Sequence, residues 1–164
     1  MKNNTWAKTL LYTYKYLERV ARGIDDLVEE HALHSFYYSS IENNDAERVS
    51  KKIISLIERK KRLINIKVLV DKCLESCNPK SASILIEKYM DNDRAEDIAM
   101  RNNLSMRTYF RRLADGEDSF SSLMTRFGFS EKKLCEYLKD ENWIKEVYNG
   151  FDKTNKAELD LELF

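Results

Sequence analysis

The stretch Asp93–Arg112, DRAEDIAMRNNLSMRTYFRR, predicts two short helices joined by a tight turn. Asp93 is placed to accept hydrogen bonds from the free N–H groups of the first helix. Glu96 follows three residues later, which is the spacing of a capping box. Ser105 is placed to cap the second helix, which we expect to end near Leu113.

The residues between the two helices favour a turn. Asn102 and Asn103 tolerate the left-handed backbone that ends a helix, because their side chains are short amides. Ala99 is small enough to let the helices cross closely, and Leu104 is expected to point inward. This order is typical of a helix-turn-helix, whose second helix enters the DNA major groove. The alternative is that these are only short helices of an all-α protein.

A third helix over Ile84–Met90 completes a tri-helical unit. Asn78 can cap, and Pro79 suits the first turn of a helix, so we expect the unit to begin at residue 78. Asp115 and Gly116 predict its end at residue 116. The expected core residues are Leu85, Tyr89, Ile98, Leu104, Tyr109 and Leu113.

Charge is balanced overall but segregated along the sequence. The 164 residues include 28 basic and 28 acidic side chains. Seven basic residues and one acid lie in Lys51–Lys67, five arginines and two acids in Arg94–Arg112, and six lysines and nine acids in Phe129–Phe164. The basic stretches can bind phosphate. For Lys51–Lys67, the alternatives are an auxiliary DNA patch and, more simply, a solvated helix face.

Residues 1–77 predict a long antiparallel helical hairpin with a loop over about 35–45. Apolar residues repeat every three or four positions along both helices, as in a packed seam. The first seam holds Leu10, Tyr14, Leu17, Ala21, Ile24, Val28 and His31, and the second holds Val49, Ile53, Leu56, Leu63, Val70, Leu74 and Cys77. A neighbouring stripe comprises Ile54, Ile57, Ile64 and Val68. This stripe is apolar surface that either the helix-turn-helix domain or a second copy of the chain can cover. If a second copy covers it, the hairpin is an oligomerisation element.

Residues 117–150 repeat the helix-turn-helix rhythm, with Gly128 at the turn and Ser130 as the next cap. Because the following helix mixes acids and lysines, we interpret it as a structural copy rather than a second DNA-reading unit. A last helix is predicted to end at Gly150. Residues 151–164 are predicted to form a flexible acidic tail.

Composition supports an all-α fold: a long antiparallel helical hairpin, a tri-helical helix-turn-helix domain and a small C-terminal helical extension. There is one Pro, there are four Gly, and good helix formers are abundant. The three cysteines form no framework and the start is not signal-like, which predicts a reduced, cytoplasmic protein. No apolar run has the length of a membrane span. His31 and His34 lack a further ligand at a diagnostic spacing, so no metal, cofactor or catalytic residue is predicted.

Three segments, Ile84–Met90, Arg94–Ala99 and Leu104–Leu113, together resemble the sigma-factor region-four superfamily. Within it, they are most similar to small phage and prophage regulators of the autolysin-regulator and late-gene-activator type. The resemblance covers about residues 79–114. It implies a transcriptional regulator that binds promoter DNA, with RNA polymerase as a further expected contact and without catalysis.

In that arrangement the second helix lies in the major groove and five residues approach base edges: Ser105, Met106, Arg107, Thr108 and Arg111. Arginine is suited to this role because its planar fork can bind guanine O6 and N7 together. Arg94, Arg101 and Arg112 are expected to contact phosphates, which position the protein without selecting sequence.

Two other functions are open on the sequence. An adaptor would bind the transcription machinery through the hairpin and the acidic end, without reading DNA. A phage DNA-packaging recognition subunit would couple a helix-turn-helix to helical oligomerisation.

Overall fold

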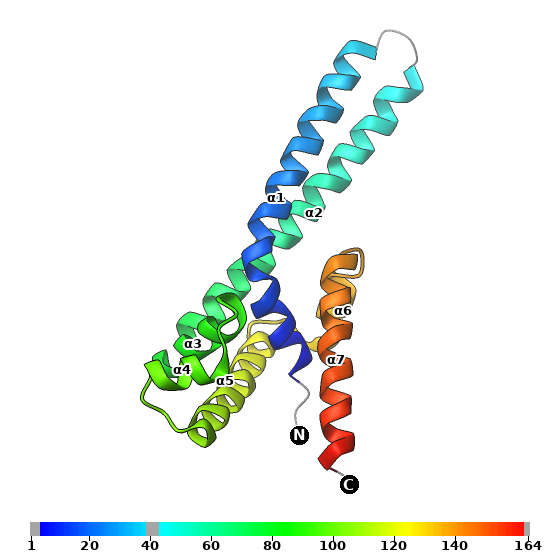
Figure 1. The fold of residues 1–164 in the computed structure, drawn as a ribbon. Helices are drawn as coiled ribbons and strands as arrows, with labels where there is room; N and C mark the ends of the chain where they lie inside the picture. Colours follow the sequence, from blue (N-terminus) through cyan, green and yellow to red (C-terminus); the bar gives the residue numbers. More distant parts are fainter. Residues whose placement is uncertain (1–3, 39–42, 163–164) are drawn as a thin grey trace. The chain divides into compact units, whose positions relative to one another are not determined.

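The computed structural model describes residues 4–38 and 43–162, which form helices and connections with no β-strand among them. The all-α fold class is therefore confirmed. The elements in order (Figure 1) are α1 (Thr5–Tyr38), α2 (Asn43–Ser76), α3 (Pro79–Leu85), the π-helical turn η1 (Ile86–Met90), α4 (Ala95–Arg101), α5 (Met106–Arg126), α6 (Glu131–Tyr137) and α7 (Asn142–Glu162). The chain divides into two compact units. One is Lys15–Lys67, and the other combines Met1–Tyr14 with Val68–Phe164.

The unit Lys15–Lys67 is an antiparallel pair of helical stretches from α1 and α2 (Figure 1). Lys60 Nζ lies 2.6 Å from Asp25 Oδ1. One heptad further along α2, Lys67 Nζ lies 3.5 Å from Glu18 Oε2. The predicted seam is buried or half-buried here, so the hairpin is present as expected. Its helices reach Tyr38 and begin at Asn43, so the loop is shorter than predicted; residues 39–42 lie outside the described residues.

The core of the other unit is built around α5. Its fully buried side chains come from α1, from the end of α2 and from α3, α4, α5, α6 and α7, and include Leu10, Leu11, Val70, Cys73, Leu85, Ile98, Tyr109, Phe120, Leu134 and Ile144. The start of α1 belongs to this core: Asn4 Nδ2 donates to Asp118 Oδ1 at 2.6 Å, and the rings of Trp6 and Tyr148 are 4.6 Å apart. The predicted core of the tri-helical unit is buried as well, except for Leu104, which is half-buried.

The helix start at Asn78 and Pro79 was predicted correctly, and the helix end near Gly116 was not. Asn78 Oδ1 accepts a hydrogen bond from the N–H of Lys80 at 3.0 Å, and Pro79 is the first residue of α3. The predicted helix end at Asp115 and Gly116 is wrong, because α5 continues through Gly116 to Arg126. An ideal Cβ on Gly116 would lie 3.4 Å from Leu85 Cγ. Gly116 is therefore a point of close approach between α5 and α3, and packing further along α5 offsets its low helix propensity.

The C-terminal prediction is also wrong for the described residues. Helix α7 does not end at Gly150 but runs to Glu162, so residues 151–162 are helical and not a flexible tail. The Phe151 ring lies edge-on to Tyr12 at 6.0 Å and to Tyr89 at 6.1 Å. These ring contacts stabilise the helical conformation of the last part of α7, whose sequence is mostly polar. Residues 163–164 lie outside the described part.

Candidate nucleic-acid interface

Helices α4 and α5 are joined by a tight turn. Asn103 adopts a positive φ of 53°, as expected for a short amide at the end of a helix. The N–H of Leu104 donates to the carbonyl of Ala99 at 2.9 Å, which closes the turn. Ser105 Oγ then accepts a hydrogen bond from the N–H of Thr108 at 3.2 Å. Of the two asparagines expected to take the left-handed backbone, Asn103 does and Asn102, with a φ of −94°, does not. The predicted cap of the second helix is confirmed.

The predicted capping role of Asp93 is wrong. The residue before α4 is Arg94, and no described side chain caps this helix. Asp93 Oδ2 instead accepts from Arg101 Nη2 at 2.6 Å, and Glu87 Oε2 lies 3.8 Å from the same nitrogen. The hydrogen bond with Asp93 is the main reason that the pKa of Arg101 is raised. A guanidinium is a stronger partner for a carboxylate than exposed backbone N–H groups are.

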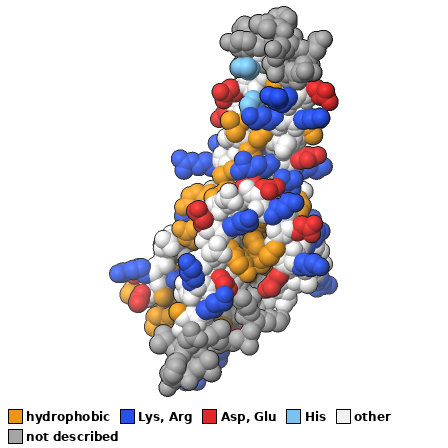
Figure 2. Space-filling model, turned by 90° about the vertical axis from the view of Figure 1, so that its right-hand side faces the viewer, with side chains coloured by type: hydrophobic (Ala, Val, Ile, Leu, Met, Phe, Trp, Pro, Cys, Tyr) orange, Lys and Arg blue, Asp and Glu red, His pale blue; other side chains and the backbone are white. Residues whose placement is uncertain are grey.

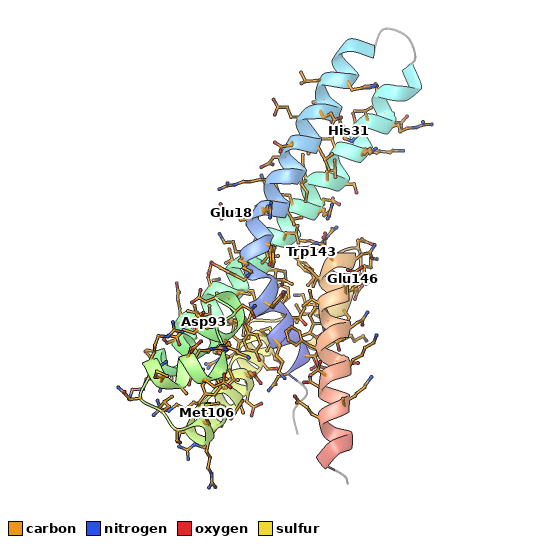
Figure 3. The ribbon with its side chains drawn as sticks, in the orientation of Figure 1. Glu18, His31, Asp93, Met106, Trp143 and Glu146 are labelled. Carbon is orange, nitrogen blue, oxygen red and sulfur yellow. The ribbon has the colours of Figure 1, made fainter. Side chains whose placement is uncertain are left out.

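The side chains of α5 that are buried determine which of its residues face solvent. Tyr109 is fully buried, and Ala99 of α4 is 3% exposed, which lets the two helices approach closely. Arg107 and Arg111 lie one helical turn apart on the exposed side. Among the described residues, neither guanidinium forms an ion pair. Met106, the first residue of α5, is 38% exposed (Figure 3).

The structure separates the other predicted contact residues into two groups. The hydroxyls of Ser105 and Thr108 are hydrogen-bonded to each other at 2.9 Å, so they mainly serve the start of the helix. Arg94 Nε lies 3.3 Å from Asp97 Oδ2, and Arg101 is paired with Asp93. Exposed ion pairs of this kind are weak, but each one places an acid where a phosphate would have to bind.

Arg112 lies apart from this outer face. It is half-buried and lines a pocket together with Lys80 of α3 and residues of the α4–α5 turn. The sequence prediction of a phosphate contact named Arg112 but not Lys80. Lys80 was missed because it comes from the start of α3, and only the packing of α3 on α5 brings the two together.

Exposed hydrophobic side chains near the arginines were also missed. Met100 at the end of α4 is 74% exposed, and Phe110 on α5 is 54% exposed. Phe110 does not belong to the spacing of buried residues that includes Tyr109 and Leu113, and this was the signal available in the sequence. An apolar side chain beside the arginines can contact a thymine methyl or a protein partner.

The turn between α5 and α6 repeats the α4–α5 turn. The N–H of Phe129 donates to the carbonyl of Met124 at 2.9 Å, and Gly128 has a φ of 93°. Ser130 Oγ accepts from the N–H of Lys133 at 3.3 Å, as Ser105 does from Thr108. The predicted repetition is therefore present in the backbone. Helix α6 carries acids and lysines on its surface, so the copy lacks the arginine face of α5.

The Lys51–Lys67 run is partly neutralised inside the hairpin unit. Lys60 and Lys67 pair with acids of α1, and Lys51 Nζ lies 3.4 Å from Glu47 Oε1. Figure 2 shows Lys and Arg side chains interspersed with Asp and Glu on the face of this unit that it draws. The arrangement favours the solvated-face interpretation over an auxiliary DNA patch.

No group of three or more His, Cys, Asp or Glu side chains in the described part of the chain is arranged to hold a metal ion. No helix within residues 4–38 and 43–162 combines the length and apolarity needed to cross a membrane. Comparisons of the chain with protein-family models, curated proteins and solved structures found no match.

Proposed function

We propose that this chain is a sequence-specific DNA-binding regulator of transcription that inserts the start of α5 into the major groove. The observation that carries the proposal is the pair of exposed arginines, Arg107 and Arg111, which lie one turn apart and have no acidic partner among the residues that the structure describes. Their guanidinium groups can each bind a guanine edge, which discriminates between bases by roughly 1–3 kcal/mol. We propose further that the chain acts in the cytoplasm and contacts RNA polymerase.

The packing below these arginines supports the proposal. A reading helix must be held rigidly, because base contacts require a fixed register. Helix α5 is capped by Ser105 and fixed by the buried Tyr109 ring and by the close approach at Gly116. The neutral net charge of the chain does not oppose DNA binding, because nearby acids pair with Arg94 and Arg101, whereas Arg107 and Arg111 form no ion pair within the described part of the chain.

A selection experiment tests the proposal without knowledge of the target. The full chain is used to enrich duplexes from a random-sequence library, and the enriched duplex is titrated by fluorescence anisotropy across salt concentrations. We expect salt-dependent binding and a preference for the enriched over the random duplex. Arg107→Ala/Arg111→Ala should remove the preference. Failure of the wild-type chain to enrich any sequence contradicts the proposal.

The exposed isoleucines of α2 favour a second candidate function, self-association or an adaptor role. Ile54, Ile57 and Ile64 are 55%, 50% and 43% exposed and lie on one side of the helix. Light scattering of the wild-type chain and of Ile57→Lys tests this candidate. A dimer that becomes a monomer in the variant supports it, a ring-sized oligomer favours DNA packaging, and a wild-type monomer without a copurifying polymerase subunit contradicts it.

A further inference from the structure

A pocket of about 530 Å³ lies beside the candidate reading helix, within the unit that contains α3, α4 and α5. Its wall is formed by the first two turns of α3, by the turn between α4 and α5, and by Arg112 of α5. The start of α3 thus meets the α4–α5 turn and α5, which follow later in the chain, around one cavity. The volume is in the range of pockets that hold small organic molecules.

The charge of this pocket is uniformly positive. Lys80 and Arg112 line it, and no Asp or Glu does. Neither cation forms an ion pair with any residue that the structure describes, in contrast to Arg94 and Arg101. Two like charges at one cavity repel each other, and an anion bound between them removes that cost.

The neutral polar groups of the pocket are suited to an oxyanion. Ser83 and Asn103 line the cavity, and in the described structure neither side chain has a hydrogen-bond partner. Asn102 is different, because its Nδ2 already donates to Glu87 Oε2 at 3.1 Å and to the Ile98 carbonyl at 2.8 Å. A hydroxyl and an amide are therefore available as donors beside the two cations.

The apolar part of the wall is formed mainly by the exposed Pro79 and the half-buried Leu104, because Ile84 is almost fully buried behind it. Inorganic phosphate alone would leave this part of the cavity unused. A phosphate ester would place its charged oxygens near Lys80 and Arg112 and its organic part against the apolar wall. Arginine and lysine are the side chains that most often bind phosphate, the first through paired N–H donors and the second as a point charge.

We infer that this pocket binds a phosphate ester, held by Lys80 and Arg112 with Ser83 and Asn103 as further donors. The ester has two sources with the same chemistry: a backbone phosphate of duplex DNA, or a free sugar phosphate or nucleotide. The first source would extend the proposed function by fixing the register of α5. The second would not depend on that function.

The test uses the full chain, with the double variant Lys80→Gln/Arg112→Gln and a matched control, Lys72→Gln/Arg126→Gln, which removes the same charge from exposed positions. The ligands are a random-sequence duplex, titrated by anisotropy across salt, and ribose 5-phosphate, titrated by calorimetry with ribose as its uncharged counterpart. Arg112→Lys keeps the positive charge but removes the paired N–H donors, so it tests whether charge alone at this position supports binding. Thermal unfolding of each variant confirms that it is folded.

A backbone phosphate is supported if the double variant lowers the salt slope on the random duplex by about 1 and the control does not. A free ester is supported if ribose 5-phosphate, but not ribose, binds the wild-type chain and the double variant weakens that binding about tenfold or more. Equal behaviour of the double variant and the control with both ligands, or no binding of either ligand, overturns the inference. A wild-type chain that enriches no sequence, but whose salt slope on the random duplex is lowered by the double variant and not by the control, overturns only the proposed function.

Discussion

The guanidinium of Arg101 is held by the carboxylate of Asp93 at 2.6 Å, whereas Arg111, on the exposed face of α5, has no acid partner among the described residues. The guanidinium of Arg111 is therefore available to bind DNA, whereas that of Arg101 is already bound to a carboxylate. We expect Arg111→Ala to weaken binding to the enriched duplex by roughly 1–3 kcal/mol and to relax the preference at one base pair. Anisotropy titration at fixed salt measures both effects.

For Arg101→Ala we expect a smaller loss of affinity, of similar size on enriched and random duplexes, because its charge is already compensated by Asp93. Arg126→Ala, an exposed arginine at the end of α5, is the control for removal of one charge. Equal losses for Arg101→Ala and Arg111→Ala would contradict the distinction that the structure makes between them.

The two serine caps provide a stability prediction. Ser105→Ala and Ser130→Ala each leave a helix N–H group without its acceptor, at Thr108 and at Lys133. We expect each change to lower the free energy of unfolding by about 1 kcal/mol, measured in urea. Ser55→Ala, at an exposed helical position, should be neutral or slightly stabilising. An unchanged midpoint for both cap variants would contradict the capping roles.

Gly116 and Gly150 should respond in opposite directions to added side chains. A side chain larger than Ala at Gly116 meets Leu85 and Ser81 of α3, so Gly116→Leu should destabilise by several kcal/mol. At Gly150 no described atom outside the local chain lies within 4 Å, so Gly150→Ala should stabilise α7 by roughly 0.5–1 kcal/mol. Thermal unfolding tests both variants. A tolerated Gly116→Leu would show that α5 and α3 are not closely packed.

The buried Glu117 predicts a pH dependence of stability. Its pKa is raised from the ordinary value of 4.5, mainly because burial penalises the charged carboxylate; the hydrogen bond from Tyr89 Oη acts in the opposite direction. The stabilising contribution of protonation is therefore complete below 4.5 and is lost as the pH rises through the raised pKa.

We therefore expect the melting temperature of the wild-type chain to fall relative to that of Glu117→Gln as the pH is raised from 4.5 to neutrality. The Gln side chain remains neutral and can still accept from Tyr89, so it serves as the reference. Glu136→Gln, at an exposed position on α6, should show no such trend. A constant difference between wild type and Glu117→Gln across this pH range would contradict the prediction.

Local sequence determined the features that depend on a few neighbouring residues. Asn103 at a left-handed turn, Ser105 and Ser130 as caps, and Pro79 at the start of α3 were predicted because their preferences come from the geometry of single side chains. The all-α class followed from composition. The seams of the hairpin followed from the spacing of apolar residues, which depends on the helical period alone.

Tertiary structure decided where helices end and which charges remain available. Gly116 predicts a helix end locally, but close packing of α5 on α3 carries the helix past it. Contacts of Phe151 with Tyr12 and Tyr89 likewise continue α7 through a stretch whose composition indicated a tail. Because burial energy is gained from residues far apart in sequence, no local pattern contains it.

The same reason applies to the candidate site. The sequence placed arginines along Arg94–Arg112, and only the fold pairs Arg101 with Asp93 and brings Lys80 to Arg112. Charge pairing depends on distance in space, and the packing of α3 and α4 against α5 sets that distance. The sequence by itself therefore determined the local turn and the arginines on either side of it. The tertiary structure decided which of those arginines pair with an acid and which face outward with no acidic partner among the described residues.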